Sequence, residues 1–339
     1  MPIFNIGQSN PYKLPVLDSV YPVDVNQLQQ DGGTATFEVK IATHGIPDEY
    51  TYQWYVNGTA VTGENATTFT KTGLTSAATH TVYCMVTNRA GSVQSRTAVL
   101  SVKGLKPEYT YSGTASLVDD GSGNYRLKFL SSGKLKFTEL GNFTGGIDVF
   151  CVGGGAGSAI GLNAAGGGGG YTTTTKDVSI EPNVEYTITV GSGGSAGGNA
   201  GGTSSFDSLA SAAGGGSKTN IQSGGSGGGG GGSNGPGGNG GSNGSAGSDG
   251  YNGYPKGSGQ GTTTREFGLS NGTLYAGGGG GATDYAEDYE TPGNGGSGGG
   301  GRGSSPNRSG VAGTANTGGG GGGGSKAGGS GIVIIRNKR

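Results

Sequence analysis

The feature that most constrains this chain is a set of uninterrupted glycine runs in its second half. The longest are Gly166 to Gly170, Gly227 to Gly232, Gly277 to Gly281, Gly298 to Gly301 and Gly318 to Gly324. Residues 151–339 hold 67 of the 83 glycines, so this part has too few apolar side chains for an ordinary core. Collagen is excluded, because it needs glycine at every third position and abundant proline.

Composition alone allows the runs to be a flexible linker or an ordered domain. Strand-like segments at both ends favour a domain, since Asp148 to Val152 precedes the region and Ile332 to Ile335 closes it. A linker needs no apolar segment at its far end, whereas a domain whose first and last strands pair does. We therefore expect the runs to be polyglycine II helices, extended threefold helices whose backbone groups bond to neighbouring runs.

The segment before the glycine runs predicts a second all-β base. Tyr125 to Leu130 and Lys134 to Phe137 have strand character and are separated by Ser131-Ser132-Gly133, which predicts a hairpin. We expect residues 104–127 to be a linker or strand connection, and residues 128–339 to form the glycine-rich domain of strands and polyglycine II helices.

Residues 31–103 predict a β-sandwich, because short alternating segments are separated by turn signals such as Asn57-Gly58. The segment from Tyr52 to Gly58, with Trp54, and the segment from Tyr83 to Ser92 resemble the C and F strands of immunoglobulin-like domains. That resemblance implies a spacer, with direct ligand binding as the alternative. The usual partner of Cys84 is absent, so we expect Cys84 and Cys151 to be buried free thiols.

Residues 1–30 contain four prolines and little periodicity, which indicates an extended N-terminal arm. Its apolar residues either attach the chain to another protein or wrap around the neighbouring domain. The candidate attachment residues are Ile3, Phe4, Tyr12, Leu14 and Leu17. The sequence has neither a secretion signal nor an apolar stretch long enough to span a membrane, so we expect no membrane insertion, and export by another route or release by lysis.

Charge and motif content argue against an enzyme. Residues 151–339 carry ten basic and ten acidic side chains, which leaves no net field for nucleic acid. Both histidines, His44 and His80, lie outside this region, so no zinc set and no hydrolase triad is expected. The Gly-x-Gly-x-x-Gly matches lack a βαβ context. We therefore expect no cofactor, no metal and no catalytic residues.

Several segments of the glycine-rich part resemble one known class of domain. They are Val152 to Gly157, Gly166 to Thr172, Tyr186 to Gly194, Gly201 to Phe206 and Gly328 to Arg336. They look like the glycine-rich domains of bacteriophage tail fibre and receptor-binding proteins, over residues 128–336. The resemblance implies variable loops between stacked polyglycine II helices, with receptor recognition in the loops.

The receptor-binding candidates are bulky residues on the islands between glycine runs, because aromatic and charged side chains dominate recognition surfaces. They are Tyr251, Tyr254, Lys256, Arg265, Phe267, Tyr275, Asp284, Tyr285, Tyr289, Arg302 and Arg308. The alternative is that these islands plug the ends of the helices or face a neighbouring subunit. The acidic segment from Asp284 to Glu290 fits a recognition loop, a solvated loop or, less well, a calcium loop.

Together these features predict an all-β virion protein, assembled in the host cytoplasm, that acts as a tail fibre or receptor-binding adhesin. The arm would bind other virion proteins, and the islands would bind a surface glycan or outer-surface protein of a bacterium. The resemblance also implies a homo-oligomer, with a trimer as the expected state. The alternative function is a capsid decoration or head fibre without a specific receptor.

Overall fold

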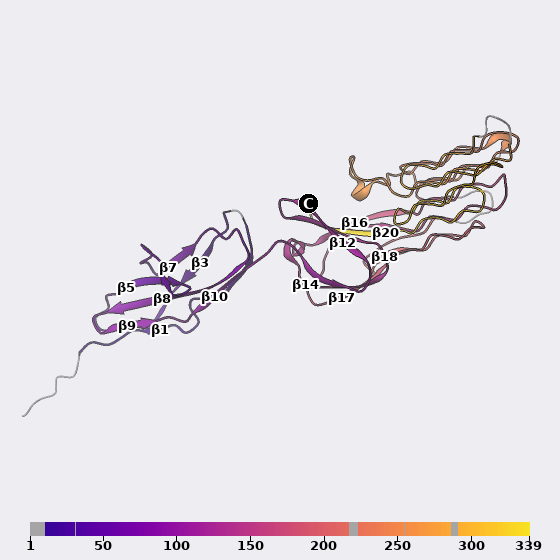
Figure 1. Cartoon of the computed structure of the whole chain (residues 1–339). Coiled ribbons are helices and arrows are strands. Elements are labelled where there is room, and N and C mark those ends of the chain that lie inside the picture. The colour runs from indigo at the N-terminus through magenta and orange to yellow at the C-terminus, as the bar shows by residue number, and fades with distance from the viewer. Residues whose placement is uncertain (1–10, 31, 217–222, 254, 286–290) are drawn as a thin grey trace, which may run out of the picture. The chain divides into compact units, whose positions relative to one another are not determined.

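The computed structural model describes residues 11–30, 32–216, 223–253, 255–285 and 291–339. It divides into two compact units, Met1–Leu105 and Lys106–Arg339 (Figure 1). Within the described residues, both units consist of strands and loops, and the second unit adds three 3-10 turns, which confirms the predicted all-β fold. In the same part of the chain, no helix has the length and apolar character needed to cross a membrane.

The first unit is built from short strands that form one large sheet and two strand pairs. The strands are β1 (Val16–Leu17), β2 (Val25–Leu28), β3 (Ala35–Glu38), β4 (Ile41–Thr43), β5 (Thr51–Val56), β6 (Thr59–Ala60), β7 (Thr68–Lys71), β8 (Ala78–Asn88), β9 (Gly91–Gln94) and β10 (Ala98–Lys103). The large sheet has the order β2-β10-β8-β5-β6, with β9 paired to β8, and the two pairs are β1-β4 and β3-β7.

The core of the first unit lies between the large sheet and the β3-β7 pair. Trp54 is fully buried there and stacks on Phe69, with ring centroids 5.7 Å apart, and Phe37 packs behind Phe69. Asn57 and Gly58 both have positive φ and connect β5 to β6, as the turn signal predicted. Cys84 is a buried free thiol, as expected, and burial raises its pKa to about 11.

The N-terminal segment is part of the first unit from residue 11 onward. Strand β1 pairs with β4, β2 pairs in parallel with β10, and Leu17 packs against the core. Tyr12 and Leu14 are exposed, whereas Ile3 and Phe4 lie outside the described residues. Residues 16–17 and 25–28 of this segment are therefore part of the sheets of the first unit.

Strand β2 is joined to β10 by an ion pair as well as by backbone bonds. Asp24 accepts hydrogen bonds from Nη1 and Nη2 of Arg96, at 2.9 and 2.8 Å, and from the backbone N–H of Val99 at 2.8 Å. These bonds, first that of Arg96 and then that of Val99, lower the pKa of Asp24 to about 2.

Stability of the first unit should therefore depend on pH through Asp24. Because the pKa of Asp24 is lower in the folded than in the unfolded chain, its ionised form stabilises the fold at pH values above the ordinary pKa of 3.8. This stabilisation is lost as the pH falls from about 4 to 2. We expect Asp24→Asn to lower the melting temperature at pH 7 and to have little effect at pH 2. Fluorescence of Trp54, the single tryptophan, reports this unit alone. An equal effect of Asp24→Asn at both pH values would contradict the assignment.

The second unit has two five-stranded sheets. Its strands are β11 (Glu108–Tyr111), β12 (Ala115–Gly121), β13 (Asn124–Phe129), β14 (Gly133–Glu139), β15 (Ile147–Val152), β16 (Thr172–Val178), β17 (Glu185–Thr189), β18 (Ser204–Phe206), β19 (Ala210–Ala212) and β20 (Ile332–Asn337), with 3-10 turns η1 (Gly141–Phe143), η2 (Tyr251–Gly253) and η3 (Glu266–Gly268). The sheet orders are β11-β14-β17-β18-β19 and β12-β13-β20-β15-β16. Both sheets contribute to one buried core, which includes Phe129, Phe137, Cys151 and Ile335.

Strand pairing in this unit confirms one prediction and overturns another. Strand β20 pairs antiparallel with β15 from Ile147 to Val152, so the first and last strands around the glycine runs are neighbours, as predicted. The predicted hairpin is wrong, because β13 and β14 lie in different sheets and Gly133 begins a strand that pairs with β11 and β17. Residues 104–127 contain β11, β12 and the start of β13 of these sheets.

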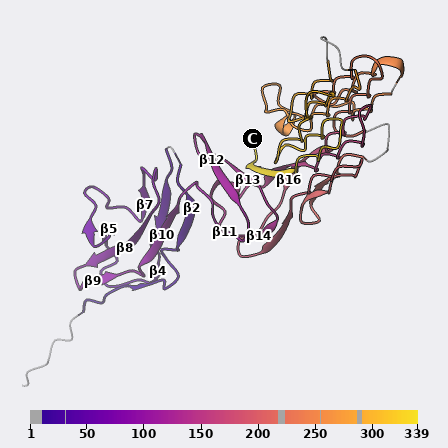
Figure 2. The ribbon, with the colours of Figure 1, turned by 45° about the vertical axis from the view of Figure 1, so that its right-hand side comes forward.

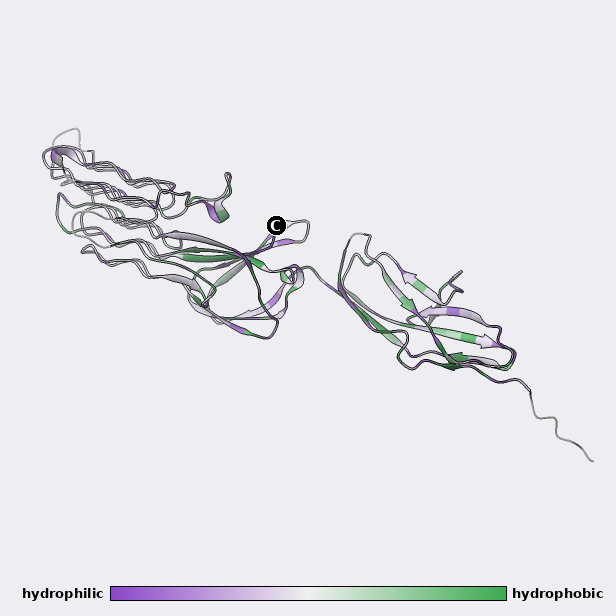
Figure 3. Cartoon of the chain, turned by 180° about the vertical axis from the view of Figure 1, so that it is seen from behind, coloured by the Kyte–Doolittle hydropathy of each residue, from purple (hydrophilic) through white to green (hydrophobic). Residues whose placement is uncertain are grey.

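The glycine segments between these strands form what we call the glycine bundle: residues 153–170, 191–202, 213–216, 223–253, 255–285 and 291–331. Its segments run out from the sheets side by side and turn back repeatedly (Figures 1 and 2). Colouring by hydropathy shows apolar residues concentrated in the strands, whereas most of the bundle is pale (Figure 3). Side-chain burial therefore stabilises the sheets, and the bundle depends on its backbone.

Hydrogen bonds in the bundle repeat every three residues. In the segment 276–283, the N–H groups of Gly277, Gly280 and Thr283 donate to residues 298–304, which run parallel to it. The next set, Gly278 and Gly281, donates to residues 238–241, and the third set, Gly279 and Ala282, donates to residues 164–167. Each of these sets has its own neighbouring segment, so the buried N–H groups are satisfied by backbone carbonyls.

The segments approach each other too closely for most side chains. A Cβ atom at Gly279 would lie 2.1 Å from the carbonyl oxygen of Gly321, and one at Gly281 would lie 1.8 Å from that of Gly230. Real Cβ atoms do not come this close to backbone, so any side chain at these positions forces the segments apart. Glycine is required here for close approach rather than for chain flexibility.

Replacing a glycine inside the bundle should therefore reduce stability much more than replacing an exposed glycine. We expect Gly279→Ala to reduce the free energy of unfolding by about 3 kcal/mol or more, because the clash is with backbone. Gly145→Ala is the matched control: no atom lies within 4 Å of a Cβ built there, and its change should be within about 0.5 kcal/mol. Chemical denaturation of both variants measures the difference. Equal stability of the two would contradict the packing described.

Candidate functional site

The bundle exposes most of its side chains where its segments turn back. The segment 153–159 leaves β15, turns at residues 160–163 and returns to β16. The turns at 233–236, 251–253, 283–285 and 305–309 lie at the same end, because Ala282 bonds to Ala164 and Thr283 to Ser304. We call these five turns the tip; they lie at the end of the bundle farthest from β15 and β20 (Figure 1).

Four described candidates lie on the tip. The ring of Tyr251 lies over Gly235 and is 53% exposed. Asp284 accepts a hydrogen bond from the backbone N–H of Asn234 at 2.7 Å, and this bond lowers its pKa. The backbone N–H of Tyr285 donates to Oγ1 of Thr283, and Arg308 is exposed. The tip thus brings together residues that are far apart in the sequence.

Four other candidates fall close to the tip or outside the described residues. Arg302 is half-buried near the tip; its Nη2 donates to the carbonyl of Ser309 at 2.9 Å, and burial followed by the charge of Arg308 lowers its pKa. Lys256 is exposed and pairs with Asp249 at 3.2 Å. Tyr254 and Tyr289 lie outside the described residues.

The remaining candidates lie on a loop at the opposite end, residues 262–275, which we call the inner loop. Phe267 and Tyr275 are each 5% exposed and pack on Phe150 of β15, with ring centroids 5.7 and 5.5 Å from it. Arg265 is half-buried and its Nη1 donates to the carbonyl of Gly272. The expectation that Phe267 and Tyr275 face a receptor is corrected, because both side chains are buried. They cover the outer face of a sheet that is rich in Val and Ile and needs an apolar cover.

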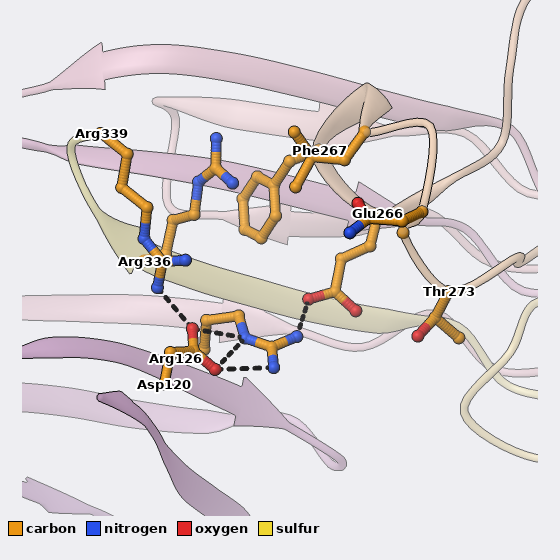
Figure 4. Close-up of a pocket in the computed structure, with 10 residues that line it drawn as sticks. Asp120, Arg126, Glu266, Phe267, Thr273, Arg336 and Arg339 are labelled. Atoms are coloured by element: carbon orange, nitrogen blue, oxygen red, sulfur yellow. Dashed lines mark hydrogen bonds and ion pairs between the residues drawn. The ribbon is translucent and has the colours of Figure 1, made fainter. Parts of the chain in front are cut away.

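A charged network surrounds the inner loop. Arg126 of β13 donates to Asp120 of β12 at 2.8 to 3.0 Å and, through Nη1, to the buried Glu266 (Figure 4). Lys128 lies 3.7 Å from Glu266, and Arg339 also pairs with Asp120. Burial alone would raise the pKa of Asp120, but its bonds from Arg126 and Arg339 lower it. The bonds of Arg126 to Asp120 and Glu266 raise the pKa of Arg126.

A second buried pair joins the two central strands. Arg336 of β20 donates to Asp148 of β15 through Nε and Nη2, at 3.1 and 2.9 Å, and its guanidinium lies 4.1 Å from the centre of the Phe267 ring. Sequence reasoning missed this network. One signal was available, since Asp148 and Arg336 each interrupt an apolar strand and thereby indicate a buried ion pair.

Among the described residues, no three His, Cys, Asp or Glu side chains gather in a way that would hold a metal ion. Cys151 is a buried free thiol, as expected, and burial raises its pKa to about 12.

Comparison with known proteins agrees with the glycine-rich character of the second unit. A family model described as a glycine-rich domain matches residues 131–338. The chain belongs to this glycine-rich domain family. The matched residues include the strands from β14 to β20 and the whole bundle, so the family model covers these strands and the glycine segments together.

No curated protein matches the chain. Among solved structures, the glycine-rich chain is similar to SGBP-B of the mixed-linkage glucan utilization locus of Bacteroides ovatus, in complex with a mixed-linkage heptasaccharide. The identity is 12%, and the match spans 58% of this chain and 66% of that chain, less than two thirds of its length. The TM-score of 0.21 does not establish a shared fold.

We expect the inner loop to stabilise the second unit, and substitution of its buried residue Phe267 tests this. We expect Phe267→Ala to destabilise the second unit by about 3–5 kcal/mol, because it empties the space between Phe150 and Arg336. Leu269→Ala on the same loop, where the side chain is 43% exposed, should change stability by about 0.5 kcal/mol or less. Calorimetry of both variants measures the difference. Wild-type stability of Phe267→Ala would contradict a structural role.

Proposed function

We propose that the chain is a bacteriophage virion protein, a tail fibre or receptor-binding adhesin that recognises a bacterial surface glycan or outer-surface protein. The observation that carries the proposal is that exposed Tyr251 and Arg308 and half-buried Asp284 lie together at one end of the bundle. Tyrosine and arginine provide large contact area and directional hydrogen bonds. We include the tip residues in the proposed receptor surface and omit Phe267 and Tyr275, because both are buried.

We further propose that the glycine segments are polyglycine II helices. The support is the three-residue repeat of the hydrogen bonds of segment 277–283, with each of its three sets directed at a different neighbour. Rigid helices of this kind would hold the tip loops in fixed positions while the loop sequences vary.

The first unit is proposed to be an immunoglobulin-like spacer. Its support is the fully buried Trp54 on β5, the position that carries the core tryptophan in the domains it resembles, and the pairing of β5 with β8 through Trp54 and Cys84. In the proposal, the N-terminal residues attach the chain to other virion proteins, and the chain assembles as a homo-oligomer, with a trimer as the expected state.

Competition with particle adsorption tests the receptor proposal. Excess purified chain, added to host cells first, should block adsorption of the particles that carry it. The double variant Tyr251→Ala with Arg308→Ala should block at least about tenfold less well, since it removes two anchoring side chains.

The matched control is Leu209→Ala, which removes an exposed side chain, 41% accessible, between β18 and β19. It should compete as well as the wild type. Undiminished competition by the double variant would reject the tip as the receptor site. Immunogold labelling on the head surface instead of the tail would favour a head fibre or capsid decoration.

A further inference from the structure

A pocket of about 270 Å³ lies between the inner loop and the last strand of the second unit (Figure 4). Charged side chains of β12, β13 and β20 form its floor, and the loop following η3 forms its rim. Asp120, Arg126, Glu266, Arg336 and Arg339 are its charged lining residues, and Asn271 and Thr273 lie on its rim. This pocket is at the opposite end of the bundle from the proposed receptor surface.

The carboxylates at the pocket are already engaged. Asp120 accepts bonds from Arg126 and Arg339. Glu266 accepts from Arg126 through one oxygen, and its other oxygen accepts from the hydroxyl of Tyr275 at 3.3 Å and lies near Lys128. A ligand that carries an ammonium group would therefore find no acidic partner here.

Positive charge, in contrast, is in excess. Among the side chains, Arg126, Lys128, Arg336 and Arg339 provide four cations and Asp120, Asp148 and Glu266 provide three carboxylates, so the side chains leave one positive charge. The bonds of Arg336 to Asp148 use Nε and Nη2, and the bond of Arg339 to Asp120 uses Nη2. Neither ion pair occupies the Nη1 group of either arginine, which can donate to another acceptor.

We propose that this pocket binds the carboxylate of a small, singly charged acidic sugar such as a uronic acid. The remaining Nη1 groups of Arg336 and Arg339 can donate to a ligand carboxylate, and a single surplus charge suits a monoanion better than a dianion such as phosphate. Asn271 and Thr273, both exposed on the rim, supply neutral donors and acceptors for sugar hydroxyls. The volume lies just below the roughly 300 Å³ at which sites for drug-sized ligands begin, which limits the occupant to about one sugar ring.

Calorimetric titration of the full chain with glucuronate tests the proposal. We expect saturable binding at one site that weakens as salt is raised, with no binding of glucose, alanine or inorganic phosphate at the same concentrations. Arg339→Gln removes one guanidinium without touching the buried Arg336 pair, and Asn271→Asp cancels the surplus charge at the rim. Each should weaken binding about tenfold.

Asn294→Asp is the matched control, because it places the same charge on an exposed residue of the bundle outside the pocket. It should bind glucuronate as the wild type does. Absence of saturation, equal binding of glucose or phosphate, or wild-type affinity in both pocket variants would overturn the proposal. Because the assay uses neither host cells nor the tip, its result is independent of the receptor test.

Discussion

Backbone-to-backbone hydrogen bonding at distances that leave no room for a Cβ atom is the constraint on which the second unit depends. A Cβ atom at Gly293 would lie 1.8 Å from the carbonyl oxygen of Gly238, and one at Gly250 would lie 1.7 Å from that of Gly231. Glycine loses the most conformational freedom on folding, so a single run could not order itself. Many runs together can, because each buried N–H finds a carbonyl on a neighbour and each segment supports the next.

This constraint decides where side chains can act. Inside the bundle they are excluded, so bulky residues gather at its two ends. At the inner end, Phe267 and Tyr275 cover the sheet that holds β15 and β20, and the Arg126 to Glu266 pair fixes the loop that carries them. At the outer end, Tyr251 and Arg308 are exposed. The aromatic side chains at the inner end therefore stabilise the sheet, whereas those at the outer end are available for contact.

The sequence predicted those strands and turns that can be recognised from a short stretch of residues. Pairing of the segment from Asp148 to Val152 with that from Ile332 to Ile335 followed from two apolar strands flanking the glycine runs, and the Asn57-Gly58 turn followed from its φ requirement. The hairpin at Ser131 to Gly133 failed because a short turn between two apolar strands is equally compatible with a crossing from one sheet to the other. Local pattern does not choose between these.

The site was harder to predict, because its contacts join distant residues. Arg126 and Glu266 are 140 positions apart, and Asp120 and Arg339 are 219 apart, so no local spacing indicates that they meet. Phe267 and Tyr275, surrounded by polar and glycine residues, were assigned to the surface for the same reason. Tyr251 and Arg308 were placed correctly at a turn, but their common location at one end depends on how the segments stack.

Amide hydrogen exchange of the segment 276–283 tests the central claim most directly. Every N–H from Ala276 to Thr283 donates to a backbone carbonyl of another segment. The account predicts that these glycine amides exchange as slowly as those of the buried strand β20, since both are released only when the unit unfolds. Exchange of the glycine amides at the rate of an unstructured chain, while β20 remains protected, would contradict it.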